Sequence, residues 1–427
     1  MTAQGLETLF DQLFPLNRSL TGEGVRESLR ILQPHIALNV HEKPSGSQVF
    51  DWTIPAEYNV QEAYITTPHG ERICDFATNN LHLMGYSQPY EGEMSLDALK
   101  PHLHTLPQQP DAIPYITSYY APRWGFCISQ NQLDALPTDG IYTIKIKTTH
   151  NPKGSLTFAD AVLQGETDEE IFFSTYICHP SMASNELSGV LVATQLYQLI
   201  AAMPKRRYTY RFAFVPETIG AINYLHQHGE HLKNKLVAGY VITCVGNEAP
   251  FTYKQARTEN CAANQIAAHI LAHKHPNYHS IRPFFPFGSD ERQYCSPAFN
   301  LPVGSLMRTM YGEYAEYHTS LDNKAFVRFE AMHQTAQTYY DICKAHELNQ
   351  NFYSQNPHCE PQLGKRNLYN SLSTKQQTTS TNQTMMWLLA YADGKNSLLH
   401  IAQKANMCIL DFEETIQLLI ENQLIKA

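Results

Sequence analysis

The part of the sequence that most constrains the fold runs from Glu170 to Ala345, where short apolar runs alternate with stretches of helical length. The apolar runs are rich in β-branched and aromatic residues, which are typical of strands, and an amphipathic stretch follows each one. The predicted strands cover residues 171–178, 208–215, 237–245 and 301–307, and the predicted helices cover residues 187–202, 220–228, 261–273 and 324–345. Strands joined by crossover helices run parallel in one sheet, with the helices covering its faces. The sequence therefore predicts an α/β fold with a mostly parallel sheet, whose active site lies beyond the carboxyl ends of the strands.

The rest of the chain lacks this regular alternation of strand-like and helical stretches. Two helices are predicted near the start, then short runs interrupted by Pro and Gly predict a compact β-rich unit, and three short helices are predicted after a polar stretch near the end. With 427 residues, 43% of them hydrophobic, the chain is long enough for several folded cores. We therefore divide it into an α/β core (residues 1–43 plus 150–348), a small β-rich insert domain (44–149), a linker (349–380) and a winged-helix-like domain (381–427).

The charge balance argues against general binding to nucleic acid or to anionic membranes. Lys and Arg number 31 and Asp and Glu number 40, which gives a formal net charge of −9. The C-terminal 47 residues contain three lysines and five carboxylates, which is the wrong sign for a DNA-binding surface. We therefore expect this terminal domain to contact protein and do not expect a nucleic-acid partner.

The nine cysteines include no Cys-x-x-Cys pair, so neither a disulfide scaffold nor a structural zinc knuckle is predicted. The first 22 residues are amphipathic and lack the apolar core of a signal peptide, and no run of eighteen apolar residues occurs anywhere. We expect a cytoplasmic protein that does not contact the membrane.

Polar residues follow each predicted strand, at the edge where an α/β active site forms. His179 follows the first strand, and Asn185 and Glu186 open the helix after it. Glu217 follows the second strand, and Asn247 and Glu248 follow the third. Farther along the chain come Asp290, in Gly-Ser-Asp, and then His318 and Asp322. Two histidines and a carboxylate drawn from separate strand ends are the donor set of a catalytic zinc site that keeps one coordination position open.

These residues carry a family resemblance. Residues 170–345 resemble the zinc aminopeptidase fold, in which a His, a bridging Asp before Ser-Gly, a Glu before Gly and a late His-Thr surround one or two zinc ions. Nearly the whole chain resembles, more closely, a bacterial family of aminopeptidase-like proteins associated with polysaccharide biosynthesis. The sequence segments that resemble this family are Leu13–Gly22, Val49–Trp52, Cys178–Ser181, Pro216–Gly220 and Glu313–Asp322.

The resemblance implies a role for several residues. His179 and His318 occupy the positions of metal-binding histidines, and Glu217 the position of a glutamate that acts as general base or as ligand. Asp290 resembles a substrate-side catalytic acid near the metal. Tyr317 and Asp322 resemble partners that orient His318.

The departures from the family pattern also have consequences. Asn185 stands where the pattern has the bridging Asp, and Gly246-Asn247-Glu248 stands where Gly-Asp-Asp is common. An amide offers one neutral oxygen, so it bridges two cations poorly. We therefore expect a single zinc ion, held by His179, His318 and one of Glu217, Glu186 or Asn185.

Two functions follow from these expectations. The first is a zinc-dependent aminopeptidase-like hydrolase that cleaves an amide bond in a small peptide-like or amino-sugar conjugate. The alternative is a catalytically impaired relative that binds a ligand in the same cleft and a protein through its terminal domain. The sequence leaves a homo-oligomer open.

Substrate contacts are also predicted. Asp290 or Glu248 could anchor an ammonium group, Arg257 or Arg292 could anchor a carboxylate or sugar acid, and Tyr317 is a further binding residue. An aromatic set in the β-rich region could line a sugar site or a subunit contact, although core packing is the simpler interpretation. This set is Trp52, Tyr115, Tyr119, Tyr120 and Trp124.

Overall fold

The computed structural model describes residues 1–368 and 380–427. These residues form two compact units. The first unit comprises Met1–Ala263 with Ser280–Ala336, and the second comprises Asn264–His279 with Gln337–Ala427. Among the described residues, no helix combines the length and the apolar character that a membrane span needs.

The first unit is built on an eight-stranded sheet. In spatial order its strands are β1 (Asn39–Pro44), β10 (Ser155–Leu163), β12 (Thr209–Val215), β11 (Glu170–Tyr176), β13 (Leu236–Val241), β16 (Val303–Met307), β14 (Phe251–Lys254) and β15 (His279–Arg282). The four central strands, β12, β11, β13 and β16, run parallel, whereas β1, β10 and β14 pair antiparallel. Every residue of β11 is buried, as expected of a parallel strand covered on both faces.

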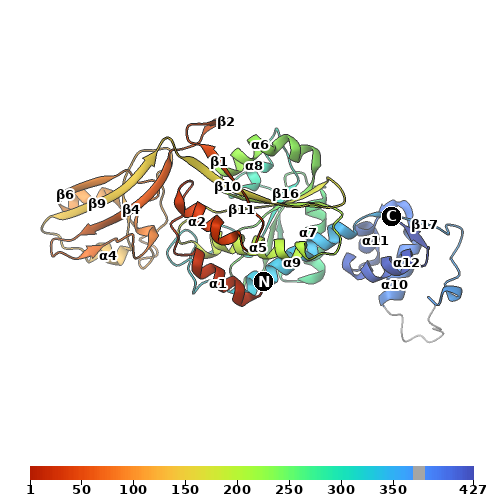
Figure 1. Ribbon diagram of the computed structural model, residues 1–427. Helices are drawn as coiled ribbons and strands as arrows, with labels where there is room; N and C mark the ends of the chain where they lie inside the picture. The colour runs from red at the N-terminus through yellow and green to blue at the C-terminus, as the bar shows by residue number, and fades with distance from the viewer. Residues whose placement is uncertain (369–379) are drawn as a thin grey trace. The chain divides into compact units, whose positions relative to one another are not determined.

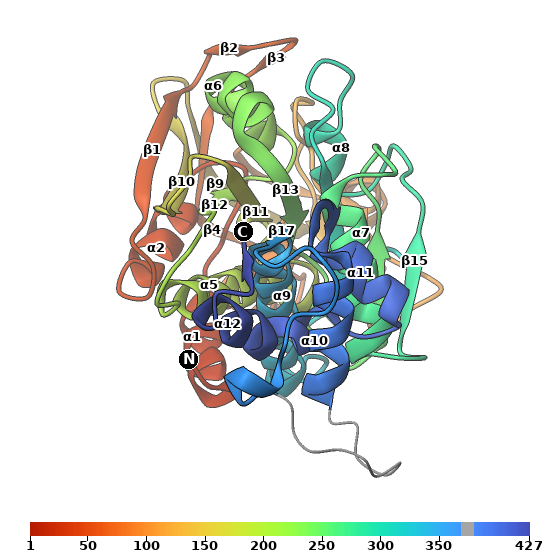
Figure 2. The ribbon, with the colours of Figure 1, turned by 90° about the vertical axis from the view of Figure 1, so that its right-hand side faces the viewer.

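Helices cover both faces of this sheet (Figure 1). One face carries α6 and α8, and the other carries α1, α2 and α5, an arrangement that is also visible after the 90° turn of Figure 2. The helices of the first unit are α1 (Ala3–Leu13), α2 (Glu23–Leu32), α5 (Ser188–Ala201), α6 (Ile219–Lys235) and α8 (Glu291–Tyr294). Nearly all of α7 (Ala262–Lys274) belongs to the second unit, and α9 (Phe329–Leu348) continues from the first unit into the second. The predicted helix-covered, mostly parallel sheet is therefore present.

Two predicted boundaries differ from the structure for local reasons. The strand predicted to reach Val245 ends at Val241, because the chain bends before Cys244, which adopts a left-handed backbone conformation with φ +52°. The helix predicted to stop at His228 continues to Lys235. Gly229 lies inside this helix, and a Cβ at this position would overlap the ring of Phe299, so the packing favours glycine there.

The β-rich region lies between β1 and β10 in sequence. Its main sheet has the order β5 (Arg72–Ile73), β4 (Glu57–Thr66), β9 (Tyr142–Asn151) and β6 (Tyr90–Met94). The shorter elements are β2 (Gln48–Val49), β3 (Trp52–Thr53), α3 (Leu96–Leu99), β7 (Leu103–His104), β8 (Phe126–Cys127) and α4 (Gln130–Asp134). One face of the main sheet packs on a separate apolar cluster that includes Ile65, Phe126 and Ile144.

The C-terminal part of the second unit contains three helices and a small sheet. The helices are α10 (Ser380–Tyr391), α11 (Leu398–Ala405) and α12 (Glu413–Glu421), and the sheet has the order β18 (Asp393–Ser397), β17 (Asn351–Ser354) and β19 (Ile425–Lys426). β17 falls inside the linker predicted for residues 349–380, so the folded domain begins earlier than its helical pattern indicated. A four-residue strand flanked by polar residues carries too little periodicity to be recognised. The Lys-Gln-Gln-Thr-Thr portion of that linker lies outside the described residues.

Candidate active site

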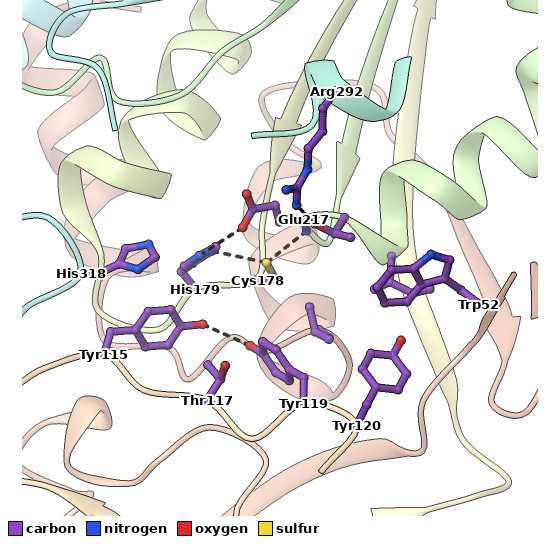
Figure 3. A pocket seen from close by; sticks show the side chains of 13 residues that line it. Trp52, Tyr115, Thr117, Tyr119, Tyr120, Cys178, His179, Glu217, Arg292 and His318 are labelled. Carbon is purple, nitrogen blue, oxygen red and sulfur yellow. Dashed lines mark hydrogen bonds and ion pairs between the residues drawn. The ribbon is translucent and has the colours of Figure 1, made fainter. Parts of the chain in front are cut away.

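Segments that follow two parallel strands, together with a late loop, meet at one pocket of about 400 Å³. His179 comes from the segment after β11, Glu217 from the turn after β12, and His318 from the loop after β16. Because β11, β12 and β16 belong to the parallel part of the sheet, their carboxyl ends meet at one edge. Figure 3 shows the two imidazoles beside each other, with Glu217 on one side and Tyr115 on the other.

His179 is held in one orientation by a buried carboxylate. Its Nδ1 lies 3.2 Å from Oε2 of Glu186, which also accepts the backbone N–H of His179. With the Nδ1 proton donated to Glu186, Nε2 presents its lone pair toward the pocket, where Oε2 of Glu217 lies 3.5 Å away. Burial lowers the pKa of His179, but the hydrogen bond and charge of Glu186 and the charge of Glu217 outweigh this, so its pKa is raised above its ordinary value.

Glu186 is itself paired with Arg18, a residue 168 positions earlier in the chain. The Nε of Arg18 donates to Oε1 of Glu186 at 2.9 Å, and both side chains are fully buried. Nη1 of Arg18 donates to the carbonyl of Leu13. Arg18, Glu186 and His179 therefore form a buried chain of charge-assisted contacts that reaches the pocket.

His318 completes the pair of imidazoles. Its ring centroid lies 5.6 Å from that of His179, and its ring stacks on Tyr317 at 4.0 Å. The ring of Tyr115 lies 5.2 Å from each imidazole, and the backbone N–H of Tyr115 donates to the carbonyl of His318. Burial lowers the pKa of His318 to about 3, so the ring is neutral, and its Nε2 is buried without a hydrogen-bond partner.

Of the carboxylates in the described residues, Glu217 alone lines this pocket, and its side chain is 25% exposed. Burial raises its pKa, and the positive charges of His179 and Arg292 oppose the rise. Asp290 lies beneath it and does not line the pocket. Its Oδ1 accepts the backbone N–H of Thr218 at 2.7 Å, and burial raises its pKa well above the ordinary value. Asp290 therefore fixes the turn that carries Glu217, whereas the sequence predicted a direct catalytic role.

Asp322 does not orient His318 as predicted. Its carboxylate accepts the backbone N–H groups of Ser184 (2.6 Å) and Asn185 (2.9 Å), and burial raises its pKa to about 7. The turn after His318 brings Asp322 to the helical turn Ala183–Leu187 that follows β11, so its carboxylate caps the donors at the start of that turn. The orienting contact on His318 is the stacked ring of Tyr317, whose side chain does not line the pocket as a substrate-binding residue would.

Asn185 is buried and does not itself line the pocket. Its Nδ2 donates to the hydroxyl of Tyr176 at 3.0 Å, and its Oδ1 has no hydrogen-bond partner. Asn247 is also buried, and its Nδ2 donates to Thr309. Glu248 is exposed and is not among the residues that line this pocket.

The residues in the pocket fit a catalytic metal ion. Nε2 of His318 is buried without a partner among the described residues, Nε2 of His179 faces the pocket, and the Glu217 carboxylate lies beside it, so two imidazoles are available to zinc and the acid is placed to act as ligand or as general base. A second cluster, Cys178, His179 and Glu186, has its donor atoms within 4.8 Å of one another, but it suits a metal poorly. Both oxygens of Glu186 are already engaged by Arg18 and His179, and burial raises the pKa of Cys178 well above its usual value, which keeps its thiol protonated.

Most of the aromatic set lines the pocket and is not core. Trp52, Tyr115, Tyr119 and Tyr120 are lining residues, whereas Trp124 packs in the β-rich region against Tyr90. The partial exposure of Trp52 (39%) and Tyr120 (53%) could not be inferred from residue type. Sequence reasoning also missed Arg18 as part of the site. The only indication in the sequence was that Arg18 lies within Leu13–Gly22, a segment that resembles the family.

The comparison with family profiles identifies the chain. The profile described as a domain of unknown function, DUF4910, matches residues 7–349, and a winged helix-turn-helix profile matches residues 350–427. The chain belongs to the DUF4910 family. Its relatives include a protein of Clostridium acetobutylicum named as a polysaccharide biosynthesis protein with an aminopeptidase-like domain, 43% identical over 95% of this chain and 92% of that one. The resemblance identified from the sequence is thus confirmed.

Solved structures agree with this assignment. A crystal structure of a protein named as a peptidase from Clostridium acetobutylicum has a TM-score of 0.92 at 41% identity, over 99% of this chain and 96% of that one. A zinc aminopeptidase of Bacillus subtilis has a TM-score of 0.57 at 10% identity, over 81% of this chain and 94% of that one. The second likeness shows the fold alone. The predicted fold class, an aminopeptidase-type α/β core with a C-terminal winged helix, is confirmed.

Proposed function

We propose that this DUF4910 protein is a zinc-dependent hydrolase that cleaves an amide bond in a small peptide-like or amino-sugar conjugate. The observation that carries the proposal is that two imidazoles and one carboxylate, from His179, His318 and Glu217, line one pocket. The name of the Clostridium relative supports a place in polysaccharide metabolism, and the aminopeptidase-like core supports hydrolysis.

His179 and His318 would hold the zinc ion through Nε2, and Oδ1 of Asn185, which lacks a partner, is suited to be the third ligand. A zinc ion bound there supplies a more acidic water and polarises a substrate carbonyl. A neutral amide oxygen in this set weakens metal binding relative to a carboxylate, which favours a single ion.

The residues of the chain then have distinct tasks. Glu217 takes a proton from the attacking water at Oε2 and passes it to the departing nitrogen, a task that suits a carboxyl group whose pKa is raised by burial. Glu186 and Arg18 keep His179 in the tautomer with Nε2 unprotonated. Asp290 keeps the Glu217 turn in place through Thr218.

The test combines metal analysis with a hydrolysis screen of amino-acid arylamides and amino-sugar amides. We expect about one zinc per chain in the wild type and a large loss of zinc in His179→Ala and His318→Ala. Glu217→Gln is the matched control: it should keep its zinc and lose about 10²–10⁴-fold in kcat/KM. A wild type with neither zinc nor turnover would refute the hydrolase and leave the ligand-binding relative as the remaining function.

A further inference from the structure

A second pocket of about 560 Å³ adjoins the reaction pocket and differs from it in charge. The two share three lining residues, Trp52, Thr218 and Arg292, so they form neighbouring compartments of one cleft. In the part of the chain that the structure describes, the charged residues lining the second pocket are Arg257 and Arg292, and no carboxylate lines it. This is unusual on a chain with a net charge of −9.

Both guanidinium groups have N–H donors that no carboxylate of the described residues engages. Nη2 of Arg292 donates to the hydroxyl of Thr218 at 3.1 Å, while its Nε is buried without a hydrogen-bond partner. Nη1 of Arg257 makes a long contact of 3.5 Å with the carbonyl of Cys295, and the residue is exposed. Within residues 1–368 and 380–427, neither arginine forms an ion pair with a carboxylate. A buried donor left without an acceptor is costly, and an acceptor on a ligand would remove that cost.

Arg292 is also held rigidly. It lies on the short helix α8, whose first residue, Glu291, forms a fully buried ion pair with Lys254 at 2.6 Å. The last residue of α8, Tyr294, shares a hydrogen bond of 2.8 Å with Ser174 of the central strand β11. In Figure 3 the Arg292 side chain extends from this helix toward Glu217. A guanidinium group that is already held in place loses little conformational entropy when it binds a planar or tetrahedral anion.

We infer that the second pocket is an anion subsite. The substrate is then an amide that carries a carboxylate or phosphate group on the part of the molecule that extends past Trp52 into this pocket. This inference rests on the proposed hydrolase and names its substrate class. Among the described residues, Glu217 is the one acid that lines either compartment, and it faces His179, so the cleft offers an ammonium group no further carboxylate. Asp290, which the sequence predicted as an ammonium anchor, is buried, and Glu248 is outside both pockets. The cleft thus favours acidic conjugates over the free amino termini that an ordinary aminopeptidase needs.

Calorimetric titration of the full-length protein tests the subsite without turnover. Three probes share one sugar ring and differ in charge: glucuronate carries a carboxylate, glucose 6-phosphate carries a phosphate, and glucose is neutral. We expect at least one anionic probe to bind at least tenfold more tightly than glucose, and the stronger of the two identifies the anion. Arg257→Gln should weaken that binding by about tenfold, Arg257→Lys should weaken it less, and the exposed Arg30→Gln on α2 should leave it unchanged.

Equal binding of glucose and both anions, or full affinity in Arg257→Gln, would overturn the inference. Arg257 is exposed, so its variants should fold, and an unchanged thermal midpoint checks this. A parallel assay with a neutral amide separates the two proposals. If the hydrolase proposal fails, no amide is cleaved although anions still bind. If only the subsite fails, neutral amides are cleaved and charge makes no difference to binding.

Discussion

Removing Arg18 should destabilise the α/β unit far more than removing an exposed arginine. Arg18 and Glu186 form an ion pair at 2.9 Å, and both side chains are fully buried. The substitution Arg18→Met keeps an unbranched side chain of similar length but leaves the carboxylate of Glu186 buried with only His179 nearby. Breaking a buried pair from one side costs about 3–5 kcal/mol, and we expect the lower end because His179 remains 3.2 Å away.

The measurement is urea unfolding followed by tryptophan fluorescence. Trp387 lies in the second unit, so a Trp387→Phe background restricts the signal to Trp52 and Trp124 in the first. With a denaturant slope of about 3 kcal/mol/M, a loss of 3 kcal/mol lowers the midpoint by about 1 M. The exposed Arg30, which pairs with Glu23 and Glu27 at the surface, is the matched control, and Arg30→Met should not move the midpoint measurably.

The double variant decides whether the charge is the cause. Arg18→Met with Glu186→Gln removes both charges, so it should recover at least half of the loss, whereas lost packing would persist in both variants. A midpoint shift below about 0.3 M in Arg18→Met, or a double variant as unstable as the sum of the single ones, would refute the reasoning.

Two further predictions concern other parts of the chain. In the second unit, Nε2 of His269 accepts the backbone N–H of Ile409, and burial lowers its pKa to about 4. The unfolded state binds the proton more tightly, so stability present above pH 6.5 is lost as pH falls toward 4, by about 1–2 kcal/mol after solvent screening. Hydrogen exchange at Ile409, corrected for its intrinsic pH dependence, should show this loss in the wild type and not in His269→Gln; equal profiles would contradict it. In the first unit, Gly22→Ala should lower the unfolding free energy by well over 1 kcal/mol, because Gly22 has φ +107° and a Cβ would overlap the carbonyl oxygen of Tyr58. Gly46→Ala, at φ +80° with open space around it, should show the backbone strain alone, and equal losses in both variants would rule out the overlap.

The α/β core was predictable because its signals are local. A strand such as Ile171–Tyr176 is rich in aromatic and β-branched residues and is buried on both faces, and the helix after it repeats its apolar residues at helical spacing. The order of strands and crossover helices then limits the topology to a parallel sheet. The same reasoning missed β17, whose four residues carry no such repeat.

Candidate residues of the site were partly predictable for the same reason. His179 and Glu217 follow strands directly, so parallel strands bring them to one edge. The roles of Asp290 and Asp322 were not predictable, because both carboxylates turn away from the pocket and bind backbone N–H groups. Where a side chain points after a loop depends on the path of that loop, which residue type does not encode.

By itself, the sequence determined the layered fold, the order of its domains and the strand ends that carry polar residues, because each depends on patterns within about twenty residues. Only the tertiary structure decided which of those residues share a pocket and which partner each one has. Arg18 reaches Glu186 across 168 positions, and Arg257 and Arg292 line one pocket from separate segments. Such contacts arise when distant segments pack together, and buried charges must then find partners, since water no longer solvates them.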